Sequence, residues 1–126
     1  MEKRKTAVVV DRSTVLSHAL VETAQRLELG PTEIGRIVGV SQPTASRLLK
    51  GGYLLKETAK EWELSAHLVR LYRSLFSLVG GDEGLARGWL RSANEAFAGQ
   101  EPIALIKRID GLIHVCEYLD AYRARV

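Results

Sequence analysis

The sequence predicts an all-α protein in which an N-terminal helix-turn-helix bundle is joined by one long helix to a small helical C-terminal domain. Apolar residues recur at helical spacing through most of the chain, and no strand pattern is convincing beyond the first residues. Residues 32–51 indicate a short helix, a tight turn and a second short helix. A leucine repeat with alternating spacings of four and three follows. We therefore divide the chain into a flexible tail (1–11), a helix-turn-helix domain (12–56) and a long helix with a second domain (57–126).

Composition and charge limit the functional classes. With 126 residues, 46% of them hydrophobic, the chain can form one domain or two very small ones around a shared core. Residues 1–56 hold nine Lys or Arg against five Asp or Glu, a net of +4, whereas residues 57–126 hold nine against ten, a net of −1. A basic N-terminal half favours a polyanionic partner. A single cysteine, no secretory signal pattern and no membrane-spanning window predict a cytoplasmic protein without membrane contact.

The N-terminal elements are predicted from their caps. Ser13 or Thr14 caps a first helix that runs to about Glu28, and Thr32 caps the next. Gly39 ends that second helix, where a residue without Cβ is favoured. Ser41 caps the third helix, and its first turn tolerates Pro43 because the amides there lack intrahelical partners.

The outer face of the third helix carries the residue types that read DNA. Gln pairs with adenine, Arg with guanine, and Ser or Thr contact bases or phosphate from the major groove. The preceding helix offers two further phosphate ligands, Thr32 and Arg36. An ordinary helical hairpin with a solvated face is the plainer alternative. The predicted DNA-binding residues are Gln42, Thr44, Ser46, Arg47, Lys50, Thr32 and Arg36.

The long helix, expected over Thr58–Val79, has two adjacent apolar rows. So wide an apolar arc needs neighbours on both sides, which we expect to be the C-terminal half and a second copy, making a homodimer. The residues predicted for core or dimer packing are Leu64, Leu68, Leu71, Leu75 and, from the following helix, Trp89.

Shorter elements complete the chain. Asp82 caps a helix in which Gly84 and Gly88 would permit close helix contact, and residues 92–100 form a loop. Pro102 begins a further short helix. In a last helix, from about Asp110 to Ala124, Cys116 faces the core while His114 and Tyr118 are candidates for the outside.

An ordered pattern in the C-terminal half indicates a family. The pattern comprises Trp89-Leu90, Asn94, Phe97, Gly99, Pro102-Ile103, Leu105-Ile106, Gly111 and Val115. It resembles the toxin-binding domain of the Xre/MbcA/ParS antitoxins, and with the Xre-like helix-turn-helix the resemblance runs from about Ser13 to the C-terminus. The chain departs from the family at Ala93, Ala98 and Arg108, where Pro, Gly and Thr are common, so the detailed loop conformation is the part most affected.

The resemblance implies a bacterial antitoxin that dimerises, represses its own operon at operator DNA and neutralises a RES-type toxin. RES toxins degrade NAD or transfer ADP-ribose to a protein, and the antitoxin's C-terminal end covers their active site. Carried onto this sequence, the toxin-binding residues are Asn94, Gly99, Tyr122, Arg123, Arg125 and Val126. Asn94 has an equally good structural interpretation, because Asn stabilises loop turns.

Other functions remain as alternatives. The histidines His18, His67 and His114 fall on different predicted helices without ligand spacing, so we expect no catalysis, metal or cofactor. A stand-alone dimeric transcriptional repressor without a toxin partner would share the fold and the DNA-binding half. An RNA-binding helical module is disfavoured because exposed stacking aromatics are missing from the pattern.

Overall fold

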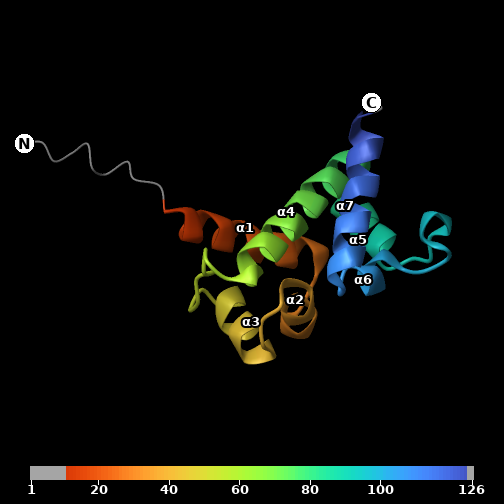
Figure 1. The fold of residues 1–126 in the computed structure, drawn as a ribbon. Coiled ribbons are helices and arrows are strands. Elements are labelled where there is room, and N and C mark those ends of the chain that lie inside the picture. The colour runs from red at the N-terminus through yellow and green to blue at the C-terminus, as the bar shows by residue number, and fades with distance from the viewer. Residues whose placement is uncertain (1–10, 125–126) are drawn as a thin grey trace, which may run out of the picture.

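The computed structural model describes residues 11–124, and Figure 1 shows them as a set of packed helices. In chain order the elements are α1 (Arg12–Leu27), α2 (Pro31–Val38), α3 (Gln42–Leu49), α4 (Lys60–Leu78), α5 (Glu83–Leu90), the 3-10 helix η2 (Glu95–Phe97), α6 (Pro102–Leu105) and α7 (Ile109–Ala124). Within this described range there is no strand, only an isolated bridge between Asn94 and Gln100. The all-α prediction is confirmed. No described helix is both long and apolar enough to cross a membrane.

Helix α1 begins earlier than the sequence suggested. Its N-cap is Asp11, whose carboxylate accepts hydrogen bonds from the amide of Ser13 at 3.1 Å and the hydroxyl of Thr14 at 2.8 Å. The prediction of Ser13 or Thr14 as the cap is therefore wrong, because three capping residues stand close together and the first one takes the role. Asp11, the last residue of the predicted tail, therefore caps this helix. The expectations for residues 1–10 lie outside the described residues.

The helix-turn-helix has the expected turn but a different first cap. Gly30 precedes α2 and Pro31 occupies its first turn, so Thr32 lies inside the helix and the prediction that it caps α2 is wrong. Gly39 ends α2 at a φ of +81°, and Ser41 caps α3 by accepting a hydrogen bond from the amide of Thr44. Ala45, on the inner face of α3, is fully buried. The two short helices are thus fixed by their ends as well as by packing.

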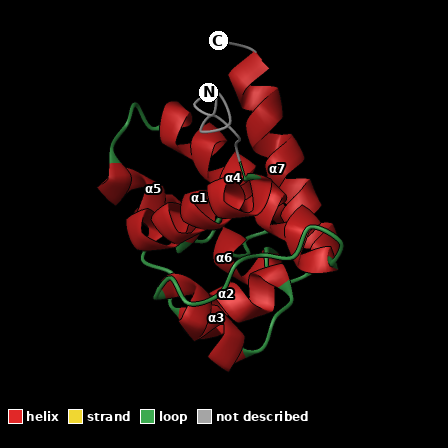
Figure 2. Cartoon of the chain, turned by 90° about the vertical axis from the view of Figure 1, so that its left-hand side faces the viewer, coloured by secondary structure: helices red, strands yellow, loops and turns green. Residues whose placement is uncertain are grey.

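Helix α4 is the centre of the fold. It packs against α1 and α2 on one side and against α7 on another, an arrangement visible in Figures 1 and 2. The four leucines predicted for packing, Leu64, Leu68, Leu71 and Leu75, are all buried within this single chain. They therefore build the core that both halves share, and the described chain leaves none of them on its surface for a second copy.

In the C-terminal half, the glycine that permits a close helix contact is Gly111, whereas the sequence analysis expected Gly84 and Gly88. A Cβ on Gly88 would meet nothing within 4 Å, and one on Gly84 would meet only the side chains of Asp82 and Arg87. The prediction that these two glycines allow close helix contact is therefore wrong. A Cβ on Gly111 would instead lie 2.0 Å from the carbonyl oxygen of Leu105, so Gly111 is the residue that lets α7 pass close to the end of α6.

Other predicted features of this half are confirmed. Asp82 caps α5 through the amide of Leu85, and Pro102 occupies the first turn of α6. Cys116 is buried, and its thiol donates a hydrogen bond to the carbonyl of His67. Burial raises the pKa of Cys116 to about 11, as suits a packed, unreactive thiol.

Candidate functional site

The exposed face of α3 is organised around Thr44. The hydroxyl of Ser41 donates to the Thr44 hydroxyl at 3.0 Å, and the Arg47 guanidinium donates to the same oxygen at 3.1 Å. Thr44 is half-buried. Its hydroxyl therefore holds Arg47 in place on the helix surface, whereas the sequence pattern suggested only a direct contact with DNA.

The remaining residues predicted to read DNA lie where they could contact the DNA major groove. Gln42, Arg47 and Lys50 are exposed along α3, and Ser46 is half-buried. Helix α3 forms one edge of the molecule in Figures 1 and 2, with no other described element outside it. An edge helix that carries an amide and two cations can enter a major groove without displacing other parts of the fold.

Helix α2 presents two of the predicted phosphate ligands to solvent. Thr32 and Arg36 are both exposed and stand one turn apart on the same face. Glu33, between them in sequence, points elsewhere and pairs with Arg91. This division keeps a carboxylate away from the face that would meet DNA backbone.

The loop after α5 is shaped by Asn94. The Asn94 side chain accepts a hydrogen bond from the amide of Ala96 at 2.9 Å, which caps η2. Its backbone carbonyl accepts from the amides of Phe97 and Gly99, and its own amide donates to the carbonyl of Gln100. These bonds give Asn94 a structural role in the loop, the second of its two sequence interpretations.

The tip of this loop, Ala98 and Gly99, is exposed to solvent. Gly99 has a φ of +81° and Ala98 a φ of +56°, so two consecutive residues adopt the left-handed conformation. Both are exposed, and a Cβ added at Gly99 would meet nothing within 4 Å. Backbone conformation therefore explains the glycine, and the exposed tip is available to a partner.

An aromatic cluster connects this loop to α7, and the sequence analysis missed it. Phe97, 5% exposed, packs edge-on against the rings of Trp89 at 6.1 Å, His114 at 5.4 Å and Tyr118 at 5.0 Å between centroids. Tyr118 in turn contacts Tyr122 at 5.0 Å. Tyr118 is half-buried, so the expectation that it faces outside is wrong, because η2 brings Phe97 against that side of α7.

The end of α7 carries the described part of the predicted toxin-binding tip. Tyr122 is 40% exposed. Arg123 donates to the hydroxyl of Ser74 on α4 at 3.0 Å, and that hydroxyl donates to Asp120 at 3.0 Å. Arg123 is therefore anchored to the long helix. Arg125 and Val126 lie outside the described residues.

Charged side chains join the two halves across α5. The Arg91 guanidinium binds both carboxylate oxygens of Glu33, at 3.1 and 3.2 Å, and the carbonyl of Glu28 at 3.2 Å. The hydrogen bond from Arg91 lowers the pKa of Glu33. Arg87 donates to the carbonyl of Arg26, and the Arg26 side chain pairs with Glu83. We call these contacts the arginine clamp; they hold α5 against the ends of α1 and α2.

No ligand cluster for a metal ion is found among residues 11–124. The histidines His18, His67 and His114 lie on three different helices, α1, α4 and α7.

Comparison with known families matches two consecutive parts of the chain. Residues 7–70 match the antitoxin Xre-like helix-turn-helix domain, and residues 74–125 match the antitoxin Xre/MbcA/ParS C-terminal toxin-binding domain. No curated protein matches the chain. The two matched segments meet inside α4, the helix that packs against both halves.

Proposed function

We propose that this chain, which belongs to the family of Xre-like antitoxins, neutralises a RES-type toxin by covering its active site and represses its own operon. The family's two domains imply a toxin partner and DNA binding. The proposal adds the class of toxin, one that degrades NAD or transfers ADP-ribose, and the way in which the antitoxin blocks it. The toxin class rests on the resemblance of the C-terminal pattern to antitoxins of RES toxins.

The observation that carries the proposal is the separation of two surfaces on one rigid frame. Gln42, Arg47 and Lys50 stand on α3, whereas the end of α7, which carries Tyr122, lies at the far side of the molecule in Figure 1. A chain built in this way can hold DNA at one end and a protein at the other. Tyr and Arg are favoured anchors of protein interfaces, which supports Tyr122 and Arg123 as toxin contacts.

In the proposed complex, the loop tip at Gly99 and the end of α7 approach the toxin together. The aromatic cluster links these two segments, so they would meet a partner as one surface. The guanidinium groups at the C-terminal end suit a cleft that otherwise receives the anionic pyrophosphate of NAD. Arg125 and Val126 belong to this proposal from the sequence alone.

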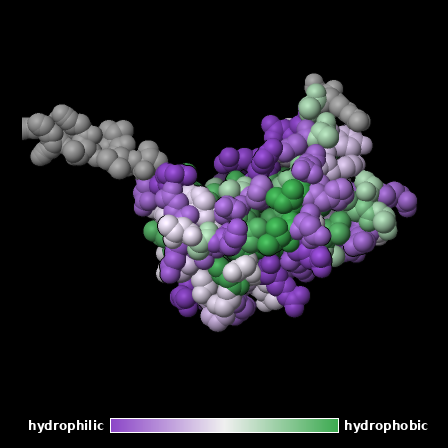
Figure 3. All heavy atoms as spheres, in the orientation of Figure 1, coloured by the Kyte–Doolittle hydropathy of each residue, from purple (hydrophilic) through white to green (hydrophobic). Residues whose placement is uncertain are grey.

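The protein is proposed to act as a homodimer. A helix-turn-helix protein gains specificity by pairing two half-sites, which a second copy would supply. Because the leucines of α4 are buried in one chain, the dimer must use other surfaces. Figure 3 shows apolar side chains gathered in the middle of one face, where α4 and α7 lie side by side, and we propose this area as the dimer contact.

The proposal predicts a gene for a RES-type toxin beside the gene for this chain, and the test is inhibition of that toxin. NAD consumption or ADP-ribosylation by that toxin is titrated with the full chain, because α4 packs against both halves and neither half has been shown to fold alone. We expect inhibition that saturates at a fixed molar ratio. A chain that binds operator DNA but never inhibits the toxin would instead be a stand-alone repressor.

A further inference from the structure

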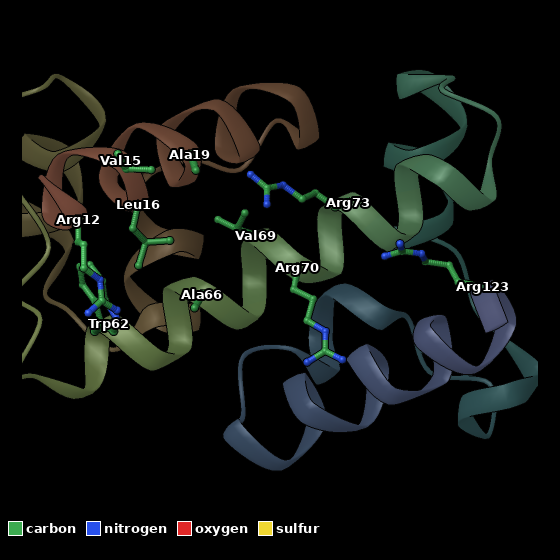
Figure 4. A pocket seen from close by; sticks show the side chains of 10 residues that line it. All are labelled: Arg12, Val15, Leu16, Ala19, Trp62, Ala66, Val69, Arg70, Arg73 and Arg123. Carbon is green, nitrogen blue, oxygen red and sulfur yellow. The ribbon is translucent and has the colours of Figure 1, made fainter. Parts of the chain in front are cut away.

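A groove lined by α1, α4 and the end of α7 shares only Arg123 with the proposed DNA and NAD-cleft contacts. Its volume is about 710 Å³, and Figure 4 shows the side chains that line it. The floor is apolar and comprises Val15, Leu16, Ala19, Trp62, Ala66 and Val69. Val15 is 55% exposed on this floor, so part of the apolar surface is open to solvent.

Guanidinium groups surround the apolar floor. Arg12, Arg70, Arg73 and Arg123 line the groove, and no carboxylate is among its described lining residues. Arg12 lies over the Trp62 ring at 5.6 Å and pairs with Glu57, and Arg70 pairs with Asp120 at 2.5 Å. Arg73 is exposed and makes no ion pair with any residue of 11–124. The groove therefore combines an apolar centre with uncompensated positive charge.

We propose that this groove binds an acidic, amphipathic helix of the toxin. Its carboxylates would pair with Arg73 and its neighbours while its apolar face would cover the floor around Val15 and Ala66. This inference rests on the proposed function. Arg123, which we placed at the toxin-facing end of α7, also lines the groove, so one partner can contact both surfaces without a break.

The shape of the groove favours a helix as its occupant. The walls are helices whose backbone groups are bonded internally, so they offer no free strand edge to which an extended segment could add. An amphipathic helix instead carries an apolar stripe flanked by charged side chains, which matches an apolar floor with charged rims.

Two other occupants fit less well. A second copy placed groove to groove would bring guanidinium groups against guanidinium groups, and such like-charge contact costs binding energy. A nucleic acid backbone would satisfy the arginines but would leave the apolar floor against phosphate and sugar. In addition, α3 lies against a different side of α1, where Leu49 and Lys50 border His18 and Val21.

The test compares exposed substitutions in the full chain for binding to an inactive variant of the neighbouring toxin. Arg73→Glu reverses the unpaired charge, and Ala66→Arg fills the floor with a residue that helices tolerate. Lys60→Glu is the matched control, since Lys60 is exposed on the same helix outside the groove. We expect each groove variant to raise the dissociation constant roughly tenfold, and the control to stay within about twofold. Circular dichroism checks that all three remain folded.

Each outcome decides the matter. If the wild type inhibits the toxin and Arg73→Glu and Ala66→Arg bind as tightly as the control, the groove inference is overturned and the proposed function stands. If the wild type neither binds nor inhibits the toxin, both fall. If the groove variants lost affinity for the operator but kept toxin binding, the groove would be assigned to nucleic acid. If they changed the oligomeric mass of the protein in the absence of toxin, the groove would be assigned to a second copy. Either result overturns the proposal.

Discussion

At residue scale, Gly111 shows how a single missing side chain permits a close contact. An added Cβ would meet the backbone carbonyl of Leu105 rather than a side chain that can turn away. The overlap can be relieved only by moving α6 or α7. Both helices carry buried residues, Ile103 and Leu112 among them, so such a movement would also disturb the core.

We predict that Gly111→Ala destabilises the fold by roughly 2–3 kcal/mol, as overpacking does in other cores. The matched control is Gly88→Ala in the last turn of α5, where the new methyl meets nothing within 4 Å. That control should gain about 0.5–1 kcal/mol from helix propensity. Urea unfolding of both variants measures the difference, and equal stabilities would contradict the close approach at Gly111.

The pair formed by Glu33 and Arg91 predicts a pH dependence. Because Arg91 lowers the pKa of Glu33 in the folded chain, the unfolded chain takes up a proton there first as the pH falls. The stabilising contribution is therefore present above the ordinary glutamate pKa of about 4.3 and is lost as the pH falls through the lower, folded value.

Arg91→Ala should return the pKa of Glu33 toward its ordinary value and flatten the acid side of the stability curve. The measurement is the NMR titration of the Glu33 carboxyl together with urea unfolding across acidic pH. Arg36→Ala, which removes an exposed arginine from the same helix as Glu33, should change neither quantity. If the pKa of Glu33 were the same in Arg91→Ala as in the wild type, the clamp would not be formed in solution.

At the scale of elements, the sequence was informative where structure is local. Helical periodicity and caps such as Ser41 and Asp82 located most helices to within a few residues. The errors arose where several residues could serve one purpose, as with Asp11 ahead of Ser13 and Pro31 ahead of Thr32. A capping pattern alone does not rank neighbouring candidates.

Contacts between distant elements were beyond the sequence pattern. The Arg91–Glu33 pair joins residues 58 positions apart. Phe97 reaches Tyr118 only because η2 folds back against α7. For the candidate site, the pattern therefore identified the face of α3 and the loop at Asn94, but not the hydroxyl of Thr44 that holds Arg47 or the groove beside α4.

Helix α3 yields a prediction about its separate residues. Arg47→Ala and Gln42→Ala should each weaken operator binding by roughly 1–3 kcal/mol and relax specificity at one base pair. Lys50→Ala should weaken binding to all DNA sequences alike, and it should reduce by about one the slope of log affinity against log salt concentration. Titrations at several salt concentrations distinguish the two classes, with Arg73→Ala as an arginine control away from α3. If Gln42, Arg47 and Lys50 could all be replaced without loss, α3 would not be the reading helix.

At the scale of the whole molecule, the arginine clamp and α4 fix the two halves relative to each other. A dimer of such a rigid protomer sets the distance between its two reading helices. We therefore predict an operator with two half-sites about one helical turn apart, or a multiple of it. Inserting about five base pairs between the half-sites should abolish paired binding because the half-sites then face different sides of the DNA, and inserting about ten should also abolish it because a dimer with a set spacing cannot reach one turn further. Footprinting of the three operators gives the answer, and indifference to the insertion would mean that protomers bind singly.

The position of α4 has a consequence for how such proteins diversify. A gene that exchanged its DNA-reading part with a relative by recombination would join two chains somewhere near α4, since the two family segments meet there. Leu68, Leu71 and Leu75 contribute to one core for both parts, so a crossover within the helix would pair leucines with neighbours selected for another chain. New combinations of operator and toxin should therefore arise more readily by gradual surface substitution than by shuffling, and lineages of the two parts should share one ancestry.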